Sequence, residues 1–434
     1  MQNGISNRRH RRDRSETKTP RQRRSPRFLW SLLFGFLYFI WGFKLARVRI
    51  AYCTTTRLPT ENAKGFQIAK VTQAFRSLGH EVEIFAPYRR NKIDQSFAAY
   101  YGLKSSVPLH QMGAVNGMAG IAPGFYGKKM AAFLFSRVLN MVLKKRKKEF
   151  DVIYTRSPEL LPKIAESGIP VILELHRLPG FGKRLFLKSI RACRLISTLT
   201  TQMRQGLIDM GVKDIPVIVE GNGVDLHDFE ALPDPADTKL SLSIPKEASL
   251  IIYAGQLESK GRAQGIPELT AAFEILLKRG LEFRAVIAGG PEDVRQRFLG
   301  EMRESLVPKV TMLGQLSHLK VPTLLIAGDV LVYTAPKTAR TYFIRDTSPL
   351  KIFEYMAACR PIVCADLPPL HDALDESMAY FFEPGNSESL ADAIRNVLDD
   401  PETAKKKALL ARAHVEQFTW EKRMERILGA AFKS

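Results

Sequence analysis

Three charged side chains stand close together in the stretch "RDTSPLKIFEYMAACRPIVCADLPP", residues 345–369, namely Asp346, Lys351 and Glu354. The apolar spacing predicts a helix that begins near Pro349 and is followed by a buried strand. A helix start binds anions, because its first N–H groups have no partner within the helix. A ligand that carries both phosphate and hydroxyl groups could therefore meet the amides and the acids at this one place.

The predicted helix requires a capping residue, and the strand after it must pair with other strands in a sheet. Thr347 or Ser348 is expected to cap the helix with its hydroxyl group. From residue 47 onward, strand-like runs alternate with helical stretches, which is typical of parallel sheets covered on both faces. The runs form two series, "RVRIAYCT", "HEVEIFAP", "FDVIYTRS", "PVILELH", "LISTLT" and "VIVEGNGVD" in the first, and "SLIIYAGQLE", "FRAVIAGG", "VTMLGQL", "DVLVYTA" and "RPIVCAD" in the second. Two doubly wound α/β domains are predicted, joined near 216–248, with ligands bound beyond the carboxyl ends of the strands.

Loops after the predicted strands carry the other residues that could do chemistry. Gly65 and Gln67 follow the first strand, where a glycine lets the backbone approach a ligand. Glu174 and His176 end "VILELH" on the same side of the strand, where the histidine could hydrogen-bond a hydroxyl or a developing charge. Lys260 lies in "AGQLESKGRAQG", a loop that could place an ammonium on a phosphate. Plain turns and a structural histidine are the alternatives, and the sequence holds neither a P-loop motif nor a dinucleotide fingerprint.

Composition and charge narrow the class of partner. The chain has 434 residues, enough for two domains and an extension, and a formal net charge of +21. Residues 1–27 hold ten Arg or Lys and two acids, which contributes +8, and a second basic run, "KKRKK", lies at 144–148. Such charge favours nucleic acid, anionic lipid or anionic small molecules. The four cysteines show no metal-ligand spacing and are interpreted as reduced packing residues of a cytosolic protein.

The amino terminus combines a basic tail with an apolar segment. Residues 1–27 lack apolar periodicity and are expected to be disordered. The next sixteen residues, 28–43, carry no charge, but a helix of that length spans about 24 Å, less than the hydrocarbon core of about 30 Å. Residues 28–45 are therefore expected to anchor the chain on the cytoplasmic face of a membrane, helped by the basic tail. A short spanning helix, an uncleaved signal and a buried core helix are the alternatives.

The second domain resembles the family-4 glycosyltransferases of the GT-B fold. The resemblance rests on "NGVD", "YAGQLESKG", "VIAGGPE", "VTMLGQLSHLKVPTLLIAGDVLVYTAP" and "SPLKIFEYMAACRPIVCAD". In the first domain "RLPTENAKGFQIAKVTQAFRSLGHEV" is similar to the acceptor-side opening of the family, and the late "FTWEKR" is similar to its terminal helix. The resemblance implies two Rossmann-like domains that face each other across a cleft. An acceptor-side domain would cover 46–218, a nucleotide-sugar-binding domain 219–412, and a helix returning to the first domain 413–434.

The resemblance also implies residues that hold the donor. Glu354 would bind the ribose hydroxyls, and the N–H groups of Leu350 and Lys351 would cradle the diphosphate. Gly290 and Gln315 lie where the loops that contact the base fall in the family. Position by position, these five residues would form most of the donor site.

Other residues would serve the reaction centre and the acceptor, again by resemblance. Lys260 matches the phosphate-binding lysine of the family, and Asp346 matches the acid that faces the donor sugar. His176 matches a histidine near the donor sugar and the reaction centre. Gly65 and Gln67 match the glycine-rich acceptor loop.

The sequence departs from the family pattern at three positions. Gln256 stands in a donor-binding loop where the family usually has arginine, which removes one cation from the leaving diphosphate. Asp346 replaces the usual glutamate, and Cys359 replaces the usual glycine. Arg262 or Arg345 is expected to supply the missing positive charge.

The chemistry implied is transfer of a sugar from a nucleotide diphosphate to a hydroxyl, with retention of anomeric configuration, by a hexosyltransferase-like enzyme. No metal or other cofactor is expected, because Lys260 and the helix amides can stabilise the leaving group and no D-x-D stands in a suitable loop. The expected partners are a nucleotide-sugar, a membrane lipid surface and a lipid-linked or glycan acceptor in polysaccharide or glycolipid synthesis. Nucleic acid is not expected, because the basic tail lacks interleaved aromatic residues. A non-catalytic GT-B relative that scaffolds a membrane-bound glycan assembly is the alternative.

Overall fold

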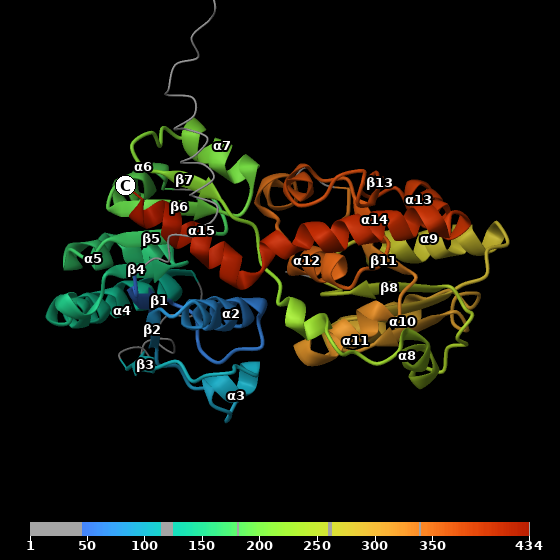
Figure 1. The fold of residues 1–434 in the computed structure, drawn as a ribbon, viewed down its shortest axis with the longest axis horizontal. Helices are drawn as coiled ribbons and strands as arrows, with labels where there is room; N and C mark the ends of the chain where they lie inside the picture. Colours follow the sequence, from blue (N-terminus) through green and yellow to red (C-terminus); the bar gives the residue numbers. More distant parts are fainter. Residues whose placement is uncertain (1–45, 114–124, 180–181, 259–262, 338–339, 434) are drawn as a thin grey trace, which may run out of the picture. The chain divides into compact units, whose positions relative to one another are not determined.

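The computed structural model describes residues 46–113, 125–179, 182–258, 263–337 and 340–433. These residues form two parallel sheets that are flanked by helices (Figure 1). The predicted basic tail, the predicted membrane anchor and Lys260 all lie outside the described residues. In the described part of the chain, no helix is both long enough and apolar enough to cross a membrane.

The first sheet has seven parallel strands in the order β3-β2-β1-β4-β5-β6-β7. Its strands are β1 (Arg49–Cys53), β2 (Glu81–Pro87), β3 (Leu109–Met112), β4 (Val152–Thr155), β5 (Val171–Leu175), β6 (Cys193–Thr198) and β7 (Val217–Val219). Its helices are α2 (Ala63–Ser77), α3 (Phe97–Tyr101), α4 (Phe125–Lys145), α5 (Leu161–Ile164), α6 (Lys183–Ile190) and α7 (Thr201–Asp209). The strand order reverses direction between β1 and β4, and such switch points are where open α/β sheets bind ligands.

The second sheet has six parallel strands in the order β10-β9-β8-β11-β12-β13. Its strands are β8 (Leu250–Ala254), β9 (Arg284–Ala288), β10 (Val310–Leu313), β11 (Val330–Tyr333), β12 (Ile362–Ala365) and β13 (Tyr380–Phe382). Its helices are α8 (Pro235–Ser241), α9 (Ile266–Lys278), α10 (Glu292–Glu301), α11 (Val321–Ile326), α12 (Leu350–Ala357), α13 (Ser387–Asp399) and α14 (Pro401–His414). The switch point of this sheet lies between β8 and β11.

Burial explains why these segments became strands. Every residue of the central strands β4, β5, β8, β11 and β12 is buried, as a sheet covered on both faces requires. Each sheet packs into a hydrophobic core of its own. The predicted α/β fold with two doubly wound sheets is therefore confirmed. The edge strands β3 and β13 were not predicted, because "LHQM" and "YFF" are too short to give a strand pattern.

Two segments connect the lobes. The chain leaves the first sheet after β7, and it returns through α14 and the last helix, α15 (Trp420–Phe432). Helix α15 packs against α2 and β6 of the first lobe, and Figure 1 shows it in red among those elements. The returning helix thus buries one face of the first sheet although it comes from the end of the chain.

The start of α12 differs from the prediction in one respect. Pro349 occupies the cap position, and no side chain caps the helix. The Ser348 hydroxyl instead accepts a hydrogen bond from the backbone N–H of Asn222, at 3.1 Å. The expected capping by Thr347 or Ser348 is therefore wrong, and the first amides of α12 stay open to a ligand.

Candidate functional site

The switch point of the second sheet holds a half-buried lysine. The amino group of Lys351 lies 4.3 Å from the ring centroid of Tyr253 and 5.3 Å from that of Tyr333, at the ends of β8 and β11. It donates a hydrogen bond to the Tyr253 hydroxyl at 3.2 Å. A Cβ atom on Gly255 would stand 2.1 Å from the Lys351 amino nitrogen, so the loop after β8 passes directly over it. This ammonium is thus held where the first turn of α12 meets the glycine loop.

Electrostatics set Lys351 and Glu354 apart from ordinary surface charges. Burial lowers the pKa of Lys351 to about 8, while the nearby Glu354 carboxylate acts to raise it. Burial raises the pKa of Glu354 to about 7, against the lowering effect of Lys351. Among the described residues neither side chain has an ion-pair partner within 4 Å. Perturbed groups of this kind, at a switch point, are typical of ligand sites.

Close backbone contacts shape the rest of the donor side. A Cβ atom on Gly289 would lie 1.8 Å from the carbonyl oxygen of Gly255, so the loops after β8 and β9 touch through glycine. A Cβ atom on Gly290 would lie 3.5 Å from the Gln315 side chain, in ordinary contact with it. Gln256 is exposed, and its backbone oxygen accepts a hydrogen bond from Tyr253 at 2.7 Å. The structure therefore gathers Gly290, Gln315 and Gln256 around the same strand ends as Lys351.

Asp346 is paired with a neighbouring arginine. It ends a π-helical turn, η6 (Tyr342–Asp346), and its carboxylate is buried. Both carboxylate oxygens accept hydrogen bonds from Arg345, at 2.6 and 3.1 Å. In this structure the Asp346 carboxylate is paired with Arg345, and its contact with a donor sugar stays a prediction. Arg345 is held beside Asp346, and Arg262, the other candidate for the substitute cation, lies outside the described residues.

A cavity of about 230 Å³ opens at the carboxyl ends of β1, β4 and β5. Its lining is polar and basic, and includes Thr54, Thr55, Lys64, Arg156, His176 and Arg177. Because these residues follow strands on either side of the first switch point, the cavity occupies a position at which open α/β sheets bind ligands.

His176 borders this cavity, but both of its ring nitrogens are engaged. Nδ1 lies 2.9 Å from Arg156, which can only donate, and Nε2 is hydrogen-bonded to Glu174. Burial and the Arg156 charge lower the pKa of His176 to about 4, so the ring is neutral at neutral pH. The predicted hydrogen bond from His176 to a substrate hydroxyl stays a prediction, and it would require one of these two contacts to break.

A buried ion pair lies behind His176. The carboxylate of Glu174 accepts hydrogen bonds from Tyr154 and from Arg423, the latter at 3.1 Å, and both charged side chains are almost fully buried. The pKa of Glu174 is held well below its usual range by Arg423 and His176, which outweigh the opposing effect of burial. Arg423 also donates to the backbone oxygen of Gly221 at 2.5 Å. Sequence reasoning missed Arg423, although the quoted "FTWEKR" contains it.

The predicted acceptor residues Gly65 and Gln67 are packed inside the protein. A Cβ atom on Gly65 would stand 1.9 Å from the Tyr101 hydroxyl, so α2 needs glycine for this contact. Gln67 is buried, and its amide donates to the Asn222 side chain at 2.6 Å. In this structure Gln67 therefore joins α2 to the segment after β7, and its contact with an acceptor stays a prediction.

Helix α2 also reaches the second lobe through charge and stacking. The amino group of Lys70 lies 3.2 Å from Asp225 and 3.3 Å from Asp228. The ring of Phe66 stacks on that of His318, with centroids 4.1 Å apart. These contacts close one side of the space between the two strand-end sites.

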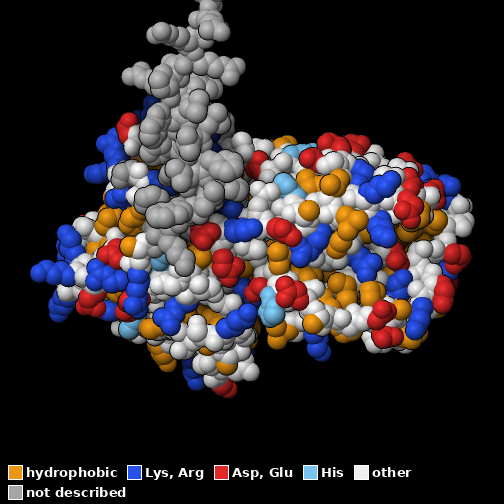
Figure 2. All heavy atoms as spheres, in the orientation of Figure 1, with side chains coloured by type: hydrophobic (Ala, Val, Ile, Leu, Met, Phe, Trp, Pro, Cys, Tyr) orange, Lys and Arg blue, Asp and Glu red, His pale blue; other side chains and the backbone are white. Residues whose placement is uncertain are grey.

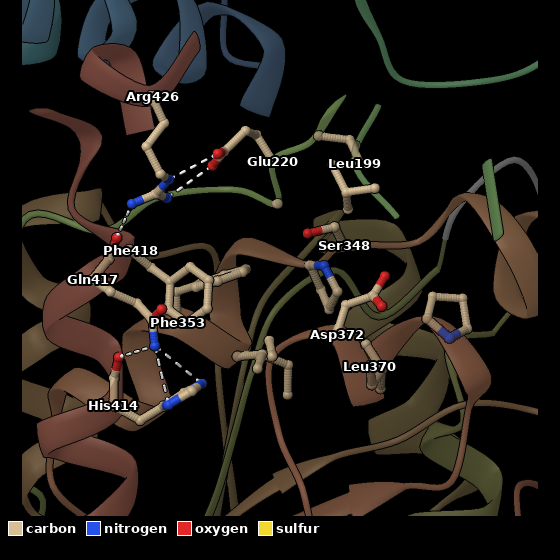
Figure 3. A pocket seen from close by; sticks show the side chains of 16 residues that line it. Leu199, Glu220, Ser348, Phe353, Leu370, Asp372, His414, Gln417, Phe418 and Arg426 are labelled. Carbon is tan, nitrogen blue, oxygen red and sulfur yellow. Dashed lines mark hydrogen bonds and ion pairs between the residues drawn. The ribbon is translucent and has the colours of Figure 1, made fainter. Parts of the chain in front are cut away.

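A second cavity, of about 280 Å³, lies where the two connecting segments meet (Figure 3). Arg426 pairs with Glu220 at its rim, and Phe353 projects into it from α12. On the α12 helix, Phe353 points away from the face that carries Lys351 and Glu354. This cavity is therefore separate from the donor side. Among the described residues no three His, Cys, Asp or Glu side chains are grouped as a metal site would need.

Comparison with known proteins agrees with this geometry. The family model "Glycosyltransferase Family 4" matches residues 66–228, and "Glycosyl transferases group 1" matches residues 236–413. Alpha-D-kanosaminyltransferase of Streptomyces kanamyceticus is 25% identical over 162 residues, which are 37% of this chain and 39% of that protein. D-inositol 3-phosphate glycosyltransferase of Kineococcus radiotolerans is 25% identical over 249 residues, 53% of this chain and 54% of that protein. The chain thus spans about two fifths to half the length of these curated relatives.

Solved structures share the fold. HepE of Anabaena in complex with UDP aligns with a TM-score of 0.68 at 15% identity, covering 89% of this chain and 100% of that one. Sucrose-phosphate synthase of Thermosynechococcus elongatus aligns with a TM-score of 0.67 at 17% identity, covering 89% and 98%. The two matched halves and the shared fold place this chain in the family-4 glycosyltransferases with the GT-B fold.

Proposed function

We propose that the chain transfers a sugar from a nucleotide diphosphate to a hydroxyl acceptor, with retention and without a metal ion. The observation that carries this proposal is the half-buried ammonium of Lys351, which lies beside the uncapped start of α12 at a sheet switch point. A diphosphate is the ligand that matches one partly buried cation and a row of free amides. The same contacts would stabilise the diphosphate as negative charge builds on it during transfer.

The neighbouring residues suit the rest of such a donor. Glu354 lies one turn after the open amides, where a ribose hydroxyl could donate to it. Gly290 lies in contact with Gln315, and the two could bind the base of such a donor. A structure of the same fold holds UDP and another holds UDP-glucose, so uridine nucleotides are the first to test. Lys260 would add a second cation to the diphosphate.

Membrane association, an acceptor that is lipid-linked or a glycan, and a role in polysaccharide or glycolipid synthesis belong to the same proposal. They are supported by the uncharged segment 28–43 and by the net charge of +21. The polar and basic cavity at the first switch point would take the acceptor.

The test is to incubate the full-length protein with labelled UDP-, GDP- and ADP-sugars and a membrane lipid extract. We expect transfer to the extract from one of these donors, and a loss of at least tenfold in Glu354→Gln. Glu301→Gln, which changes an exposed glutamate at the end of α10, is the matched control and should keep full activity. Activity that is equal in all three proteins would reject the site.

A non-catalytic relative that scaffolds a glycan assembly is the second candidate. The pairing of the buried Asp346 with Arg345 and the engaged nitrogens of His176 favour it, because the Asp346 carboxylate and the His176 nitrogens then have partners within the protein. Nucleotide-sugar binding by calorimetry, without turnover on any acceptor, would support this candidate over the enzyme.

A further inference from the structure

The basic run 144–148 has a defined place on the first lobe. It begins in the last turn of α4 and ends before β4, which pairs with β1 from Val152 and Ile50 onward. Arg49, the first residue of β1, donates to the backbone oxygen of Lys148 at 2.8 Å. The run therefore lies at the amino edge of the sheet, beside the point where the chain enters β1.

Most of the acids at this edge are already paired with arginines. Arg47 pairs with Glu81, Arg49 with Asp151, and Arg146 with both Glu83 and Glu149. Three exposed side chains remain that have no ion-pair partner among the described residues, namely Lys145, Lys147 and Lys148. Figure 2 shows Lys and Arg side chains gathered at the left edge, where Figure 1 places α4 and α5.

The short connection between the uncharged segment 28–43 and β1 indicates that these lysines face a membrane surface. The uncharged segment ends at residue 43, six residues before β1 begins at Arg49. Six residues reach at most about 20 Å. If the segment enters a bilayer, the amino edge of the sheet is held within that distance of the lipid head groups.

We propose that the amino edge of the first sheet, through Lys145, Lys147 and Lys148, docks on an anionic lipid bilayer. Each lysine near such a surface attracts the anionic head groups, and together with a buried apolar segment three of them fix an orientation. Nucleic acid is the other anionic partner that a basic cluster could take, and the test below includes it.

If the chain is the transferase proposed above, this docking determines how far from the membrane the acceptor hydroxyl must lie. The residues of the acceptor cavity follow the carboxyl ends of β1, β4 and β5, at the opposite edge of the sheet. The five residues of β1 alone separate the two edges by about 16 Å. The acceptor hydroxyl must therefore be presented well above the head groups, as on an extended glycan, and not in the plane of a short lipid head.

A rival face exists on α6, near the carboxyl edge. Leu185 is 65% exposed there, and Lys183, Arg184 and Lys188 are exposed beside it. Docking through α6 would bring the acceptor cavity down to the lipid and would overturn the proposal. Because both faces carry one exposed apolar residue next to three basic ones, they give matched label positions.

The experiment uses the full chain with Cys359→Ser, since the other three cysteines are buried. A fluorophore is attached at Met141→Cys, which is one turn before Lys145 and 57% exposed in the native chain, or at Leu185→Cys. Each protein is mixed with vesicles of phosphatidylcholine and about one third phosphatidylglycerol that carry quenchers on the head groups. We expect strong quenching at position 141 and little at position 185.

The triple change Lys145→Gln, Lys147→Gln and Lys148→Gln should reduce quenching at position 141, and the population docked by this edge should fall by up to about 100-fold. The matching change Lys183→Gln, Arg184→Gln and Lys188→Gln should leave it unchanged. Stronger quenching at 185, equal quenching in the first triple variant, or loss of quenching on adding a short oligonucleotide would overturn the proposal. The measurement needs no turnover, so a failed transferase assay leaves its result intact.

Discussion

At the scale of single residues, Lys351 has no ion-pair partner among the described residues, and we expect a ligand phosphate to supply one. Hydrogen bonds to a charged group contribute about 1.5–3 kcal/mol, so Lys351→Met should weaken UDP binding about 10- to 100-fold. In the native protein, UDP affinity should fall as the pH rises through about 8, because the lysine with its lowered pKa then loses its proton. Calorimetry across pH 6.5 to 9.5 checks both statements.

The Lys351→Met variant should lack that alkaline loss of affinity. Lys278→Met, on an exposed lysine at the end of α9, is the control and should bind UDP like the native protein. Equal affinity and equal pH dependence in the native and Lys351→Met proteins would show that the ammonium does not meet the diphosphate.

The ionised carboxylate of Glu354 should reduce the stability of the folded protein, although the proposed donor site needs it. Its folded-state pKa of about 7 lies above the ordinary value, so the folded state binds the proton more tightly than the unfolded chain does. The stability that protonation supplies is therefore full below about pH 4.5 and is lost as the pH rises through 7. Glu354→Gln should raise the free energy of unfolding at pH 8 by about 1–3 kcal/mol and leave it unchanged at pH 4. Thermal unfolding at the two pH values checks this, and a variant less stable at pH 8 would contradict it.

Several residue contacts could not be predicted from the sequence. Strand alternation placed Glu174 and His176 on one side, and they do contact each other. The partner that fixes Glu174 comes from Arg423, 249 positions later, and no local pattern reports such a distance. Asp346 is similar, because a neighbouring Arg345 can point toward a ligand or fold back onto it, and the packing decides which.

At the scale of elements, the backbone is strained just after α12, at Cys359, where the family usually has glycine. Cys359 has φ of 53°, a left-handed conformation that is unfavourable for residues with a Cβ atom. Cys359→Gly should raise the free energy of unfolding by about 0.5–1 kcal/mol, since the relieved strain exceeds the entropy cost of glycine. Cys359→Ala keeps the Cβ atom and should give no such gain. A melting temperature that rises equally in both variants would assign the effect to the thiol and not to the backbone.

Periodicity predicted the central elements well and the edges poorly. Fully buried strands such as β8 and β12 appear in the sequence as uninterrupted apolar runs. The four residues of β3 do not alternate, because its two partly buried residues, Leu109 and Met112, lie on opposite faces and the two between them are exposed. The prediction that Ser348 caps α12 was wrong for a different reason. The backbone N–H of Asn222 donates to the Ser348 hydroxyl, and only the assembled fold brings these two residues together.

At the scale of the whole molecule, the two sites depend on how the chain crosses between lobes. Each sheet supplies one switch point, and α2 closes one side of the space between them by its contacts with Asp225, Asp228 and His318. The last helix then returns and inserts Arg423 behind the acceptor cavity, where it contacts both Glu174 and the segment after β7. Position in the sequence therefore says little about which residues share a site.

Arg423, on the returning helix α15, allows a test of how much the buried ion pair with Glu174 stabilises the protein. Removing one partner of a buried ion pair leaves the other charge uncompensated, so Arg423→Met should lower the free energy of unfolding by about 3–5 kcal/mol. Arg395→Met is the control, because Arg395 and its partner Asp399 are 48% and 57% exposed, and it should cost under about 1 kcal/mol. Adding Glu174→Leu to Arg423→Met should restore part of the loss, since the carboxylate that the first change leaves unpaired is then gone, while Arg156 loses its own ion pair with Glu174. Denaturant unfolding of these variants, of Glu174→Leu alone and of the native protein measures this coupling, and costs that simply add would show that Glu174 and Arg423 act independently.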